Sequence, residues 1–212
     1  MAGWTNGAMN AGIRNLIFGY SAVTYTQDGQ FEFDKTVVKS HKETENADGT
    51  KTFTVTINDG LTYNDGTPIT AKDYVFAALL TSSPEFGALE ADTTGGTPYV
   101  GYEDFNAGKT KVFSGVRLVD DMTYSLTVKK EELPFYYDIM YASLNPYPMS
   151  VLAPGCDIKD DGKGAAITGT FTKDVLTKTI GDSKTGYRYL PKVTCGAYQL
   201  DSYDPSTKQA VL

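Results

Sequence analysis

The stretch YNDGTPITAKDYVFAALL, residues 63–80, combines a tight turn, a helix start and an apolar helix. The Asn-Asp-Gly at 64–66 predicts the turn, because these residues tolerate the backbone angles that turns require. Thr70 can cap a helix, and Asp73, three residues on, can reach back to it as in a capping box. Apolar residues then surround most of the helix. We therefore expect a helix that is buried from more than one side.

Strand patterns lie on both sides of this helix. Residues 50–57 alternate apolar residues with threonine, which predicts a half-buried strand. Residues 113–130 alternate in the same way around an Asp-Asp turn at 120–121, and residues 24–34 do so around an Asp-Gly turn. Two hairpins are therefore expected in addition to the strand.

Four further segments give less regular patterns. Residues 8–19 predict a helix that ends at Gly19, and residues 132–144 predict a second helix with a proline in its first turn. Residues 155–170 are rich in Gly, Asp and Lys and indicate an exposed loop or insertion, and residues 195–212 indicate two strands around an Asp-Pro turn. The expected apolar face of the first helix consists of Met9, Ile13, Leu16 and Ile17. Together, the predicted helices and strands indicate an α+β fold.

Composition excludes some partners. Hydrophobic residues make up 41% of the chain and charged residues 21%, as in globular proteins. The net charge of −7 would repel nucleic acid and anionic membrane surfaces, so neither is an expected partner. No apolar run has the length of about 18 residues that a membrane span needs, and the first residues do not form a signal peptide.

The two cysteines do not decide the compartment. Cys156 and Cys195 are too few for a disulfide framework and have no metal-ligand spacing. Two buried thiols and one disulfide both stay open, because cysteine often packs as a small apolar residue.

The sequence does not favour catalysis or a cofactor. His41 is the only histidine and lies in a polar stretch, so we expect a solvated loop residue rather than a general base. Residues 157–164 superficially resemble a calcium loop, but Lys159 stands where an oxygen ligand is required. No phosphate-binding glycine motif is present. We therefore predict no catalytic residue, no metal and no cofactor.

Three blocks, in order, resemble one protein family. Residues 51–80 contain D-G-T-P-x-T-A-x-D, residues 115–140 contain a D-D-x-T turn and a P-F-Y run, and residues 192–212 contain C-G-A-Y before a D-P turn. Together they resemble the family 5 extracellular solute-binding proteins, the oligopeptide and dipeptide receptors of ATP-binding-cassette importers. Cys195 replaces the usual Thr and Ala197 the common Pro, which loosens the match in the last block.

The resemblance implies the type II periplasmic-binding fold class and an N-terminal fragment, because family members are considerably longer. Residues 1–19 would begin the first lobe, residues 20–144 would form an inserted β-rich subdomain, and residues 145–212 would return to the first lobe. The first lobe would be incomplete, and the second lobe would be absent from this chain.

The resemblance also implies a function and a site. The expected function is non-catalytic capture of a solute, foremost a peptide, for an ATP-binding-cassette permease. The location would be the periplasm or the outer face of the cell membrane, with a lipid anchor on the full-length protein as the sole membrane contact. Backbone groups of Thr5, Asn6 and Gly7 would pair with an extended peptide, and Tyr99 and Tyr102 would face the cleft. The exact solute, the form of anchoring and the oligomeric state stay open.

Two other classes of function are weighed against this one. A stand-alone carbohydrate-binding or adhesive β-rich module would use a flat face of tyrosines, and a hydrolase would depend on His41. Neither accounts for the three ordered blocks. The tyrosines considered for such a face are Tyr99, Tyr102, Tyr136, Tyr137, Tyr141 and Tyr147.

Overall fold

The structure is a computed structural model that describes residues 1, 3–4, 7–204 and 206–212. Its α-helices are α1 (Ala8–Ile17), α2 (Ala71–Leu80), α3 (Pro84–Gly87), α4 (Tyr102–Asn106), α5 (Met149–Leu152) and α6 (Lys173–Leu176). Its strands are β1 (Val23–Tyr25), β2 (Phe31–Phe33), β3 (Val38–Glu45), β4 (Lys51–Ile57), β5 (Val116–Asp120), β6 (Thr123–Val128), β7 (Asp157–Asp160), β8 (Ala165–Thr168), β9 (Ser202–Asp204) and β10 (Gln209–Val211). Short 3₁₀-helices η1 (Thr94–Gly96), η2 (Lys130–Glu132) and η3 (Asp138–Ala142) and a π-helix η4 (Thr177–Gly181) connect them.

The main sheet is antiparallel, with strand order β3-β4-β6-β5. Apolar residues on one face of β4 are buried and pair across the sheet, as Val55 does with Tyr124 of β6. The predicted strand at 50–57 and both predicted hairpins are confirmed. His41 is exposed, as expected, but lies in β3 and stacks on Phe33 with ring centroids 4.0 Å apart, so its assignment to a loop is wrong.

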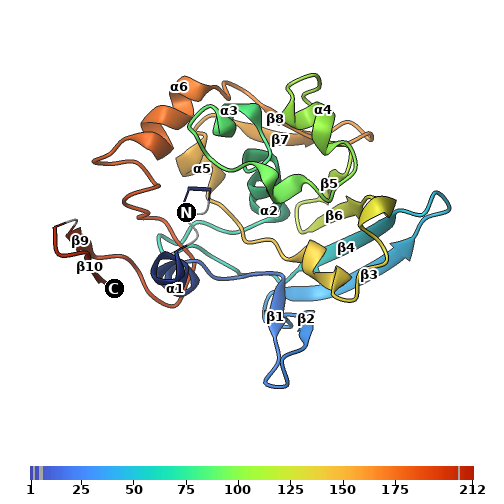
Figure 1. The fold of residues 1–212 in the computed structure, drawn as a ribbon, viewed down its shortest axis with the longest axis horizontal. Helices are drawn as coiled ribbons and strands as arrows, with labels where there is room; N and C mark the ends of the chain where they lie inside the picture. The colour runs from blue at the N-terminus through green and yellow to red at the C-terminus, as the bar shows by residue number, and fades with distance from the viewer. Residues whose placement is uncertain (2, 5–6, 205) are drawn as a thin grey trace.

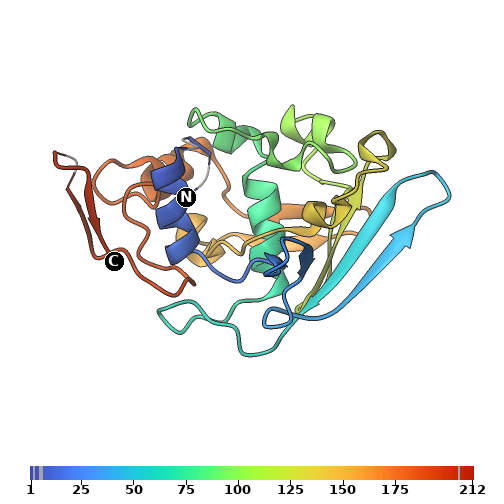
Figure 2. The ribbon, with the colours of Figure 1, turned by 60° about the horizontal axis from the view of Figure 1, so that its bottom comes forward.

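Helix α2 lies at the centre of the molecule (Figure 2). Eight of its ten residues are buried, and it contacts β5, β6, the β7–β8 hairpin and α5. Its start matches the prediction, since the Asp73 carboxylate accepts hydrogen bonds from the Thr70 amide at 2.9 Å and hydroxyl at 3.3 Å. The Tyr74 ring stacks on Tyr124 with centroids 5.3 Å apart. The turn and the capping box before this helix therefore fix where it begins. The core is built around this helix.

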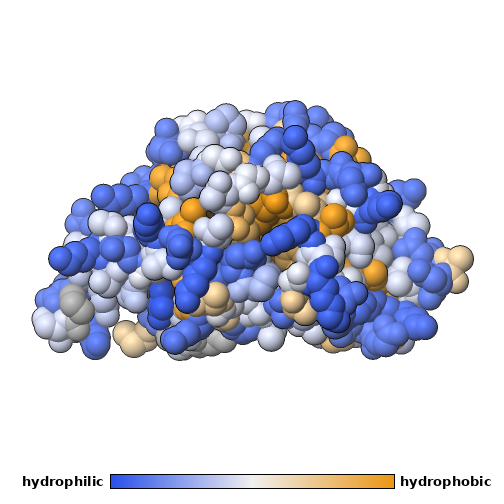
Figure 3. Space-filling model, turned by 90° about the horizontal axis from the view of Figure 1, so that it is seen from above, coloured by the Kyte–Doolittle hydropathy of each residue, from blue (hydrophilic) through white to orange (hydrophobic). Residues whose placement is uncertain are grey.

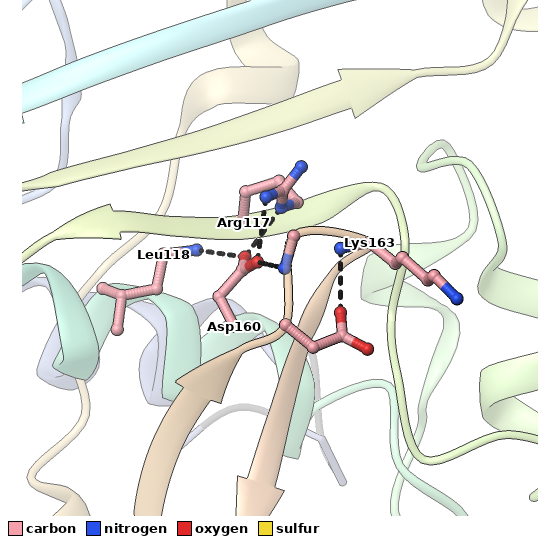
Figure 4. Close-up of polar contacts among 6 residues, drawn as sticks. Arg117, Leu118, Asp160 and Lys163 are labelled. Carbon is pink, nitrogen blue, oxygen red and sulfur yellow. Dashed lines mark hydrogen bonds and ion pairs between the residues drawn. The ribbon is translucent and has the colours of Figure 1, made fainter.

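Residues 155–170 differ from the exposed loop that we expected. They form the hairpin β7–β8, in which Ile158 and Ala165 are buried against the core. The Asp160 carboxylate accepts two hydrogen bonds from the Arg117 guanidinium of β5, at 2.7 and 2.9 Å, and one from the Leu118 amide at 3.1 Å (Figure 4). The strands were missed because each is four residues long and contains few large apolar residues.

The helix predicted at 132–144 is also wrong. The chain there forms η2 and η3, separated by irregular residues 133–137. Pro134 explains part of the difference, because a proline disfavours the helical conformation at the residue before it. The aromatic residues that follow pack against the β1–β2 hairpin, where Tyr137 contacts Phe31 with ring centroids 5.3 Å apart.

Helix α1 is confirmed, but its details differ from the prediction. Met9 is 81% exposed and Leu16 43% exposed, and only Ile17 is buried. The helix ends at Ile17, and the residue that caps it is Phe18, whose backbone is extended, rather than Gly19. Gly19 is instead needed because a Cβ there would clash with the carbonyl of Cys195.

The last residues of the chain return to α1. The Gly196 amide donates to the Ile17 carbonyl at 2.9 Å, after which β9 and β10 form the predicted hairpin. Pro205 of the predicted turn lies outside the described residues. Figure 1 shows this hairpin and α1 at one end of the molecule and the four-stranded sheet at the other. Cys156 and Cys195 are both free thiols, so the structure has no disulfide between them.

One buried cluster extends from Ala22 to Cys195, and the predicted boundaries at 19/20 and 144/145 fall in connections between elements. Seen from above, the surface is mainly hydrophilic, with several hydrophobic patches of which the most extended lies near the middle (Figure 3). Within the described part of the chain, no helix has the length and apolar character to cross a membrane.

Candidate binding site

A cavity of about 300 Å³ lies between α1, the first residues of the chain and the β9–β10 hairpin. The inward face of α1 repeats at helical spacing and presents Asn10, Ile13, Arg14 and Ile17 to it. The other lining residues are Met1, Trp4, Arg188, Tyr189, Pro191, Leu200, Tyr203 and Ala210. Most of the lining residues are apolar or aromatic, but polar and apolar atoms contribute similar shares of the lining surface. The volume is at the lower end for small-molecule sites.

Trp4 is held firmly at the cavity wall. Its indole Nε1 donates a hydrogen bond to the Leu89 carbonyl at 3.0 Å, and its ring meets Phe86 edge-on with centroids 5.1 Å apart. Arg188 lies over it, with the guanidinium carbon 4.2 Å from the indole centroid and 5.2 Å from the Tyr189 ring centroid. Such cation–π contacts orient a guanidinium without neutralising its charge.

Two arginines, Arg14 and Arg188, line the cavity, and no described lining residue is an aspartate or glutamate. Burial, followed by the charges of Arg14 and Arg188, lowers the pKa of the Met1 amino group to about 5. Burial is the larger cause of this lowered pKa, and the charges of the two arginines add to it.

The predicted peptide-contact segment lies beside this cavity in sequence. Thr5 and Asn6 are outside the described residues, so their predicted contacts stay predictions. Gly7 caps the N-terminus of α1, is exposed, and has no atom within 4 Å of the position that a Cβ would occupy. Its φ of −59° does not require glycine. The space beside Gly7 is therefore open to an approaching backbone.

The two predicted tyrosines do not line the cavity. Tyr99 is 4% exposed, and its hydroxyl donates to the Tyr141 carbonyl at 2.7 Å. Tyr102 is half-buried, and its hydroxyl donates to the Thr93 carbonyl at 2.9 Å. Both side chains pack on the Phe113 ring, so they serve the core of this chain. A ligand contact by either remains a prediction.

A second group of rings is exposed at the β1–β2 hairpin and residues 135–137. Tyr25 is 68% exposed and Tyr136 83% exposed. Neighbouring rings meet edge-on, at 86° between Tyr136 and Tyr137 and at 77° between Phe135 and Tyr137. This geometry does not provide the flat face that the carbohydrate-binding alternative requires.

Sequence reasoning missed Trp4, Arg188 and Tyr189 as members of one site. Trp4 and Arg188 are separated by nearly the whole chain, and only the fold brings them together. The one signal in the sequence was that Trp4 is the single tryptophan. Among the described residues, no cluster of His, Cys, Asp or Glu could hold a metal ion.

Comparison with known proteins identifies the class. The sequence profile described as "Bacterial extracellular solute-binding proteins, family 5 Middle" matches residues 36–212. The chain belongs to the family 5 bacterial extracellular solute-binding proteins.

Curated relatives include several receptors. The chain is 32% identical over 129 residues to the oligopeptide-binding protein OppA of Lactococcus lactis subsp. cremoris, which covers 60% of this chain and 21% of OppA. It is 28% identical over 155 residues to the probable deoxycholate-binding periplasmic protein YgiS of Escherichia coli, which covers 68% of this chain and 27% of YgiS. The alignments therefore span only about a quarter or less of these relatives.

Solved structures show the same fold. Haemophilus influenzae OppA, in complex with RPPGFSPFR, superposes with a TM-score of 0.64 at 20% identity, over 95% of this chain and 33% of OppA. Lactococcal OppA, complexed with an endogenous peptide in the closed conformation, gives a TM-score of 0.63 at 20% identity, over 95% of this chain and 33% of that structure. The fold is therefore that of type II periplasmic-binding proteins, of which this chain covers a part.

Proposed function

We propose that this chain forms part of the first lobe of a receptor that captures peptides outside the cytoplasm for an ATP-binding-cassette importer. The observation that carries the proposal is the cavity lined by Trp4 and Asn10, which in the sequence flank the residues 5–7 that are predicted to pair with a peptide backbone. Family membership and the oligopeptide-binding relatives support it. The similarity to YgiS, a probable deoxycholate-binding protein, is also compatible with an apolar solute that carries an acidic group.

In this proposal residues 1–19 and 145–212 belong to the lobe itself, and residues 20–144 form its β-rich subdomain. The chain is non-catalytic: it contributes one wall of a cleft, and a permease receives the solute. Its place is the periplasm or the outer face of the membrane, with or without a lipid anchor. Because a ligand is held by burial on most sides, one wall alone should bind peptides weakly.

A chimera tests the proposal. Residues 1–212 replace the structurally equivalent third of lactococcal OppA, and peptide binding is measured by calorimetry with a mixed peptide pool. We expect the chimera to bind peptides and the isolated chain to give little or no heat. A chimera that unfolds cooperatively yet binds no peptide would contradict the proposed function. Micromolar binding by the isolated chain would contradict its role as a single wall.

A further inference from the structure

The guanidinium of Arg188 is oriented but not neutralised. Its faces contact Trp4 and Tyr189, yet no ion pair or side-chain hydrogen bond joins its N–H groups to any described residue. The chain has three arginines, and Arg117 shows the alternative, since it is paired with Asp160. A planar guanidinium presents N–H donors along its edge that match the two oxygens of a carboxylate.

The surroundings of Arg188 favour an anion. Acidic residues outnumber basic ones, 26 to 19, in the whole chain, yet the described cavity lining includes the unpaired guanidinium of Arg188 and no carboxylate. Opposite charge in a partly enclosed site is attracted more strongly than in open water. The apolar side chains of Ile13, Ile17 and Leu200 would cover the carbon atoms next to such a charge.

We propose that this cavity binds a carboxylate group of the peptide ligand and that Arg188 is its anchor. This inference rests on the proposed function and specifies its ligand. The carboxylate comes either from the C-terminus of the peptide or from an Asp or Glu side chain. The stacking of Arg188 on Trp4 and Tyr189 fixes the guanidinium before the ligand arrives, so less conformational entropy is lost on binding.

The chain contains its own reporter for this site. Trp4 is the only tryptophan and is in contact with Arg188, so its fluorescence reports on the cavity directly. The isolated chain is titrated with three peptides of equal length. Ala-Ala-Gln carries a terminal carboxylate, Ala-Ala-Glu amide carries a side-chain carboxylate, and Ala-Ala-Gln amide carries neither.

Because the isolated chain is a single wall, binding should be weak, with a dissociation constant of about 1 mM or more. In that concentration range we expect a saturable change in Trp4 emission with at least one of the two peptides that carry a carboxylate and none with Ala-Ala-Gln amide. The peptide that acts identifies the source of the carboxylate. An equal response to all three peptides, or no response to any, would overturn the inference.

Variants distinguish a specific contact of Arg188 with the ligand from a general effect of positive charge on the protein surface. Arg188→Gln should weaken the binding of the active peptide by roughly tenfold or more, since a charge-assisted hydrogen bond is lost. Arg188→Lys keeps the charge but loses the planar fork, so binding should be intermediate. Lys192→Gln is the matched control, because it removes the same charge from an exposed residue that does not line the cavity.

Circular dichroism and thermal melting check that each variant is folded. If Arg188→Gln does not fold, two other measurements test the inference. They are the affinity of Arg188→Lys for the active peptide and the loss of wild-type binding at high salt. Arg188→Lys binding as tightly as the wild type, with no salt effect, would overturn the inference, as would equal weakening by Lys192→Gln.

The two proposals can fail separately. Placing Arg188→Gln in the OppA chimera without any loss of peptide affinity would overturn the carboxylate anchor while leaving peptide capture standing. A saturable, Arg188-dependent response in the isolated chain, alongside a folded chimera that binds no peptide, would support the anchor and overturn peptide capture.

Discussion

Asp160 of β7 lies against Arg117 of β5 with both carboxylate oxygens engaged, at 2.7 Å to Nε and 2.9 Å to Nη2. The Asp160 side chain is only 8% exposed, and the amides of Leu118 and Gly162 also donate to it. The pair therefore fixes the β7–β8 hairpin to the edge of the main sheet. Removing the charge of Asp160 leaves the partly buried guanidinium of Arg117 without its ion-pair partner.

Asp160→Asn should lower the free energy of unfolding by about 2 kcal/mol, because hydrogen bonds to a charged group are lost. Urea denaturation followed by circular dichroism measures the change. Asp161→Asn is the control, since Asp161 is exposed and accepts only from the Lys163 amide (Figure 4). Equal effects of the two substitutions would show that the ion pair does not stabilise the fold.

The same pair predicts a dependence on pH. Burial alone would raise the pKa of Asp160, but hydrogen bonds from Arg117 and from backbone amides outweigh it and lower that pKa below the ordinary value of 3.8. A carboxyl with a lowered pKa in the folded state stabilises the fold above its unfolded pKa and loses this effect as pH falls. The stability difference between wild type and Asp160→Asn should therefore be constant above pH of about 5 and shrink below pH of about 4. A difference that grows on acidification would contradict this.

Two stacked tyrosines should respond differently to the loss of a hydroxyl. The Tyr124 hydroxyl is buried and has no hydrogen-bond partner among the described residues, whereas the Tyr74 hydroxyl donates to the Tyr20 carbonyl at 2.7 Å. Tyr124→Phe should therefore be neutral or stabilising by up to about 1 kcal/mol, and Tyr74→Phe should cost about 1 kcal/mol. Urea unfolding of both variants measures the contrast. The reverse order would contradict the assigned hydroxyl contacts.

Two glycines near α1 should give opposite results. A Cβ on Gly196 would clash with the backbone of Leu16 and Ile17, so Gly196→Ala should destabilise by about 2 kcal/mol. Gly12 lies within α1 with no atom within 4 Å of a Cβ position, so Gly12→Ala should stabilise by about 0.5–1 kcal/mol. Thermal unfolding measures both. A neutral Gly196→Ala would show that residues 196–198 do not pack tightly on α1.

The two thiols should react in two phases. Cys195 is buried, and burial raises its pKa to about 11, while Cys156 is half-buried. Because the thiolate is the reactive form, a thiol reagent at neutral pH should modify Cys156 in the folded chain and Cys195 only after unfolding. Mass spectrometry of the modified peptides distinguishes them. Rapid modification of Cys195 in the folded protein would contradict its burial.

The elements predicted well are those whose local signals agree. At residues 63–80 a turn, a cap and an apolar helix all point to one structure, and α2 follows from them. The β7–β8 hairpin was missed because its position depends on distant partners, namely Arg117 and the Phe113 amide, which donates to the Ala165 carbonyl. Strands this short contain too few residues to show the alternation of apolar and polar side chains by which strands are predicted.

The candidate site was only partly predictable for the same reason. The resemblance directed attention to residues 5–7, which in the sequence lie between the cavity-lining residues Trp4 and Asn10. Arg188 could not be assigned to it, because its contact with Trp4 depends on how the end of the chain returns to α1. Tyr99 and Tyr102 illustrate the opposite case, since aromatic residues that suggest a ligand contact in sequence often complete a core.

The β9–β10 hairpin has three residues in each strand and, within the described part of the chain, pairs with no other strand. Two such short strands are marginally stable by themselves, so their amides should exchange with deuterium far faster than those of α2. Leu200, Tyr203 and Ala210 form one side of the cavity. One side of the cavity is therefore formed by a two-stranded hairpin that the main sheet does not support.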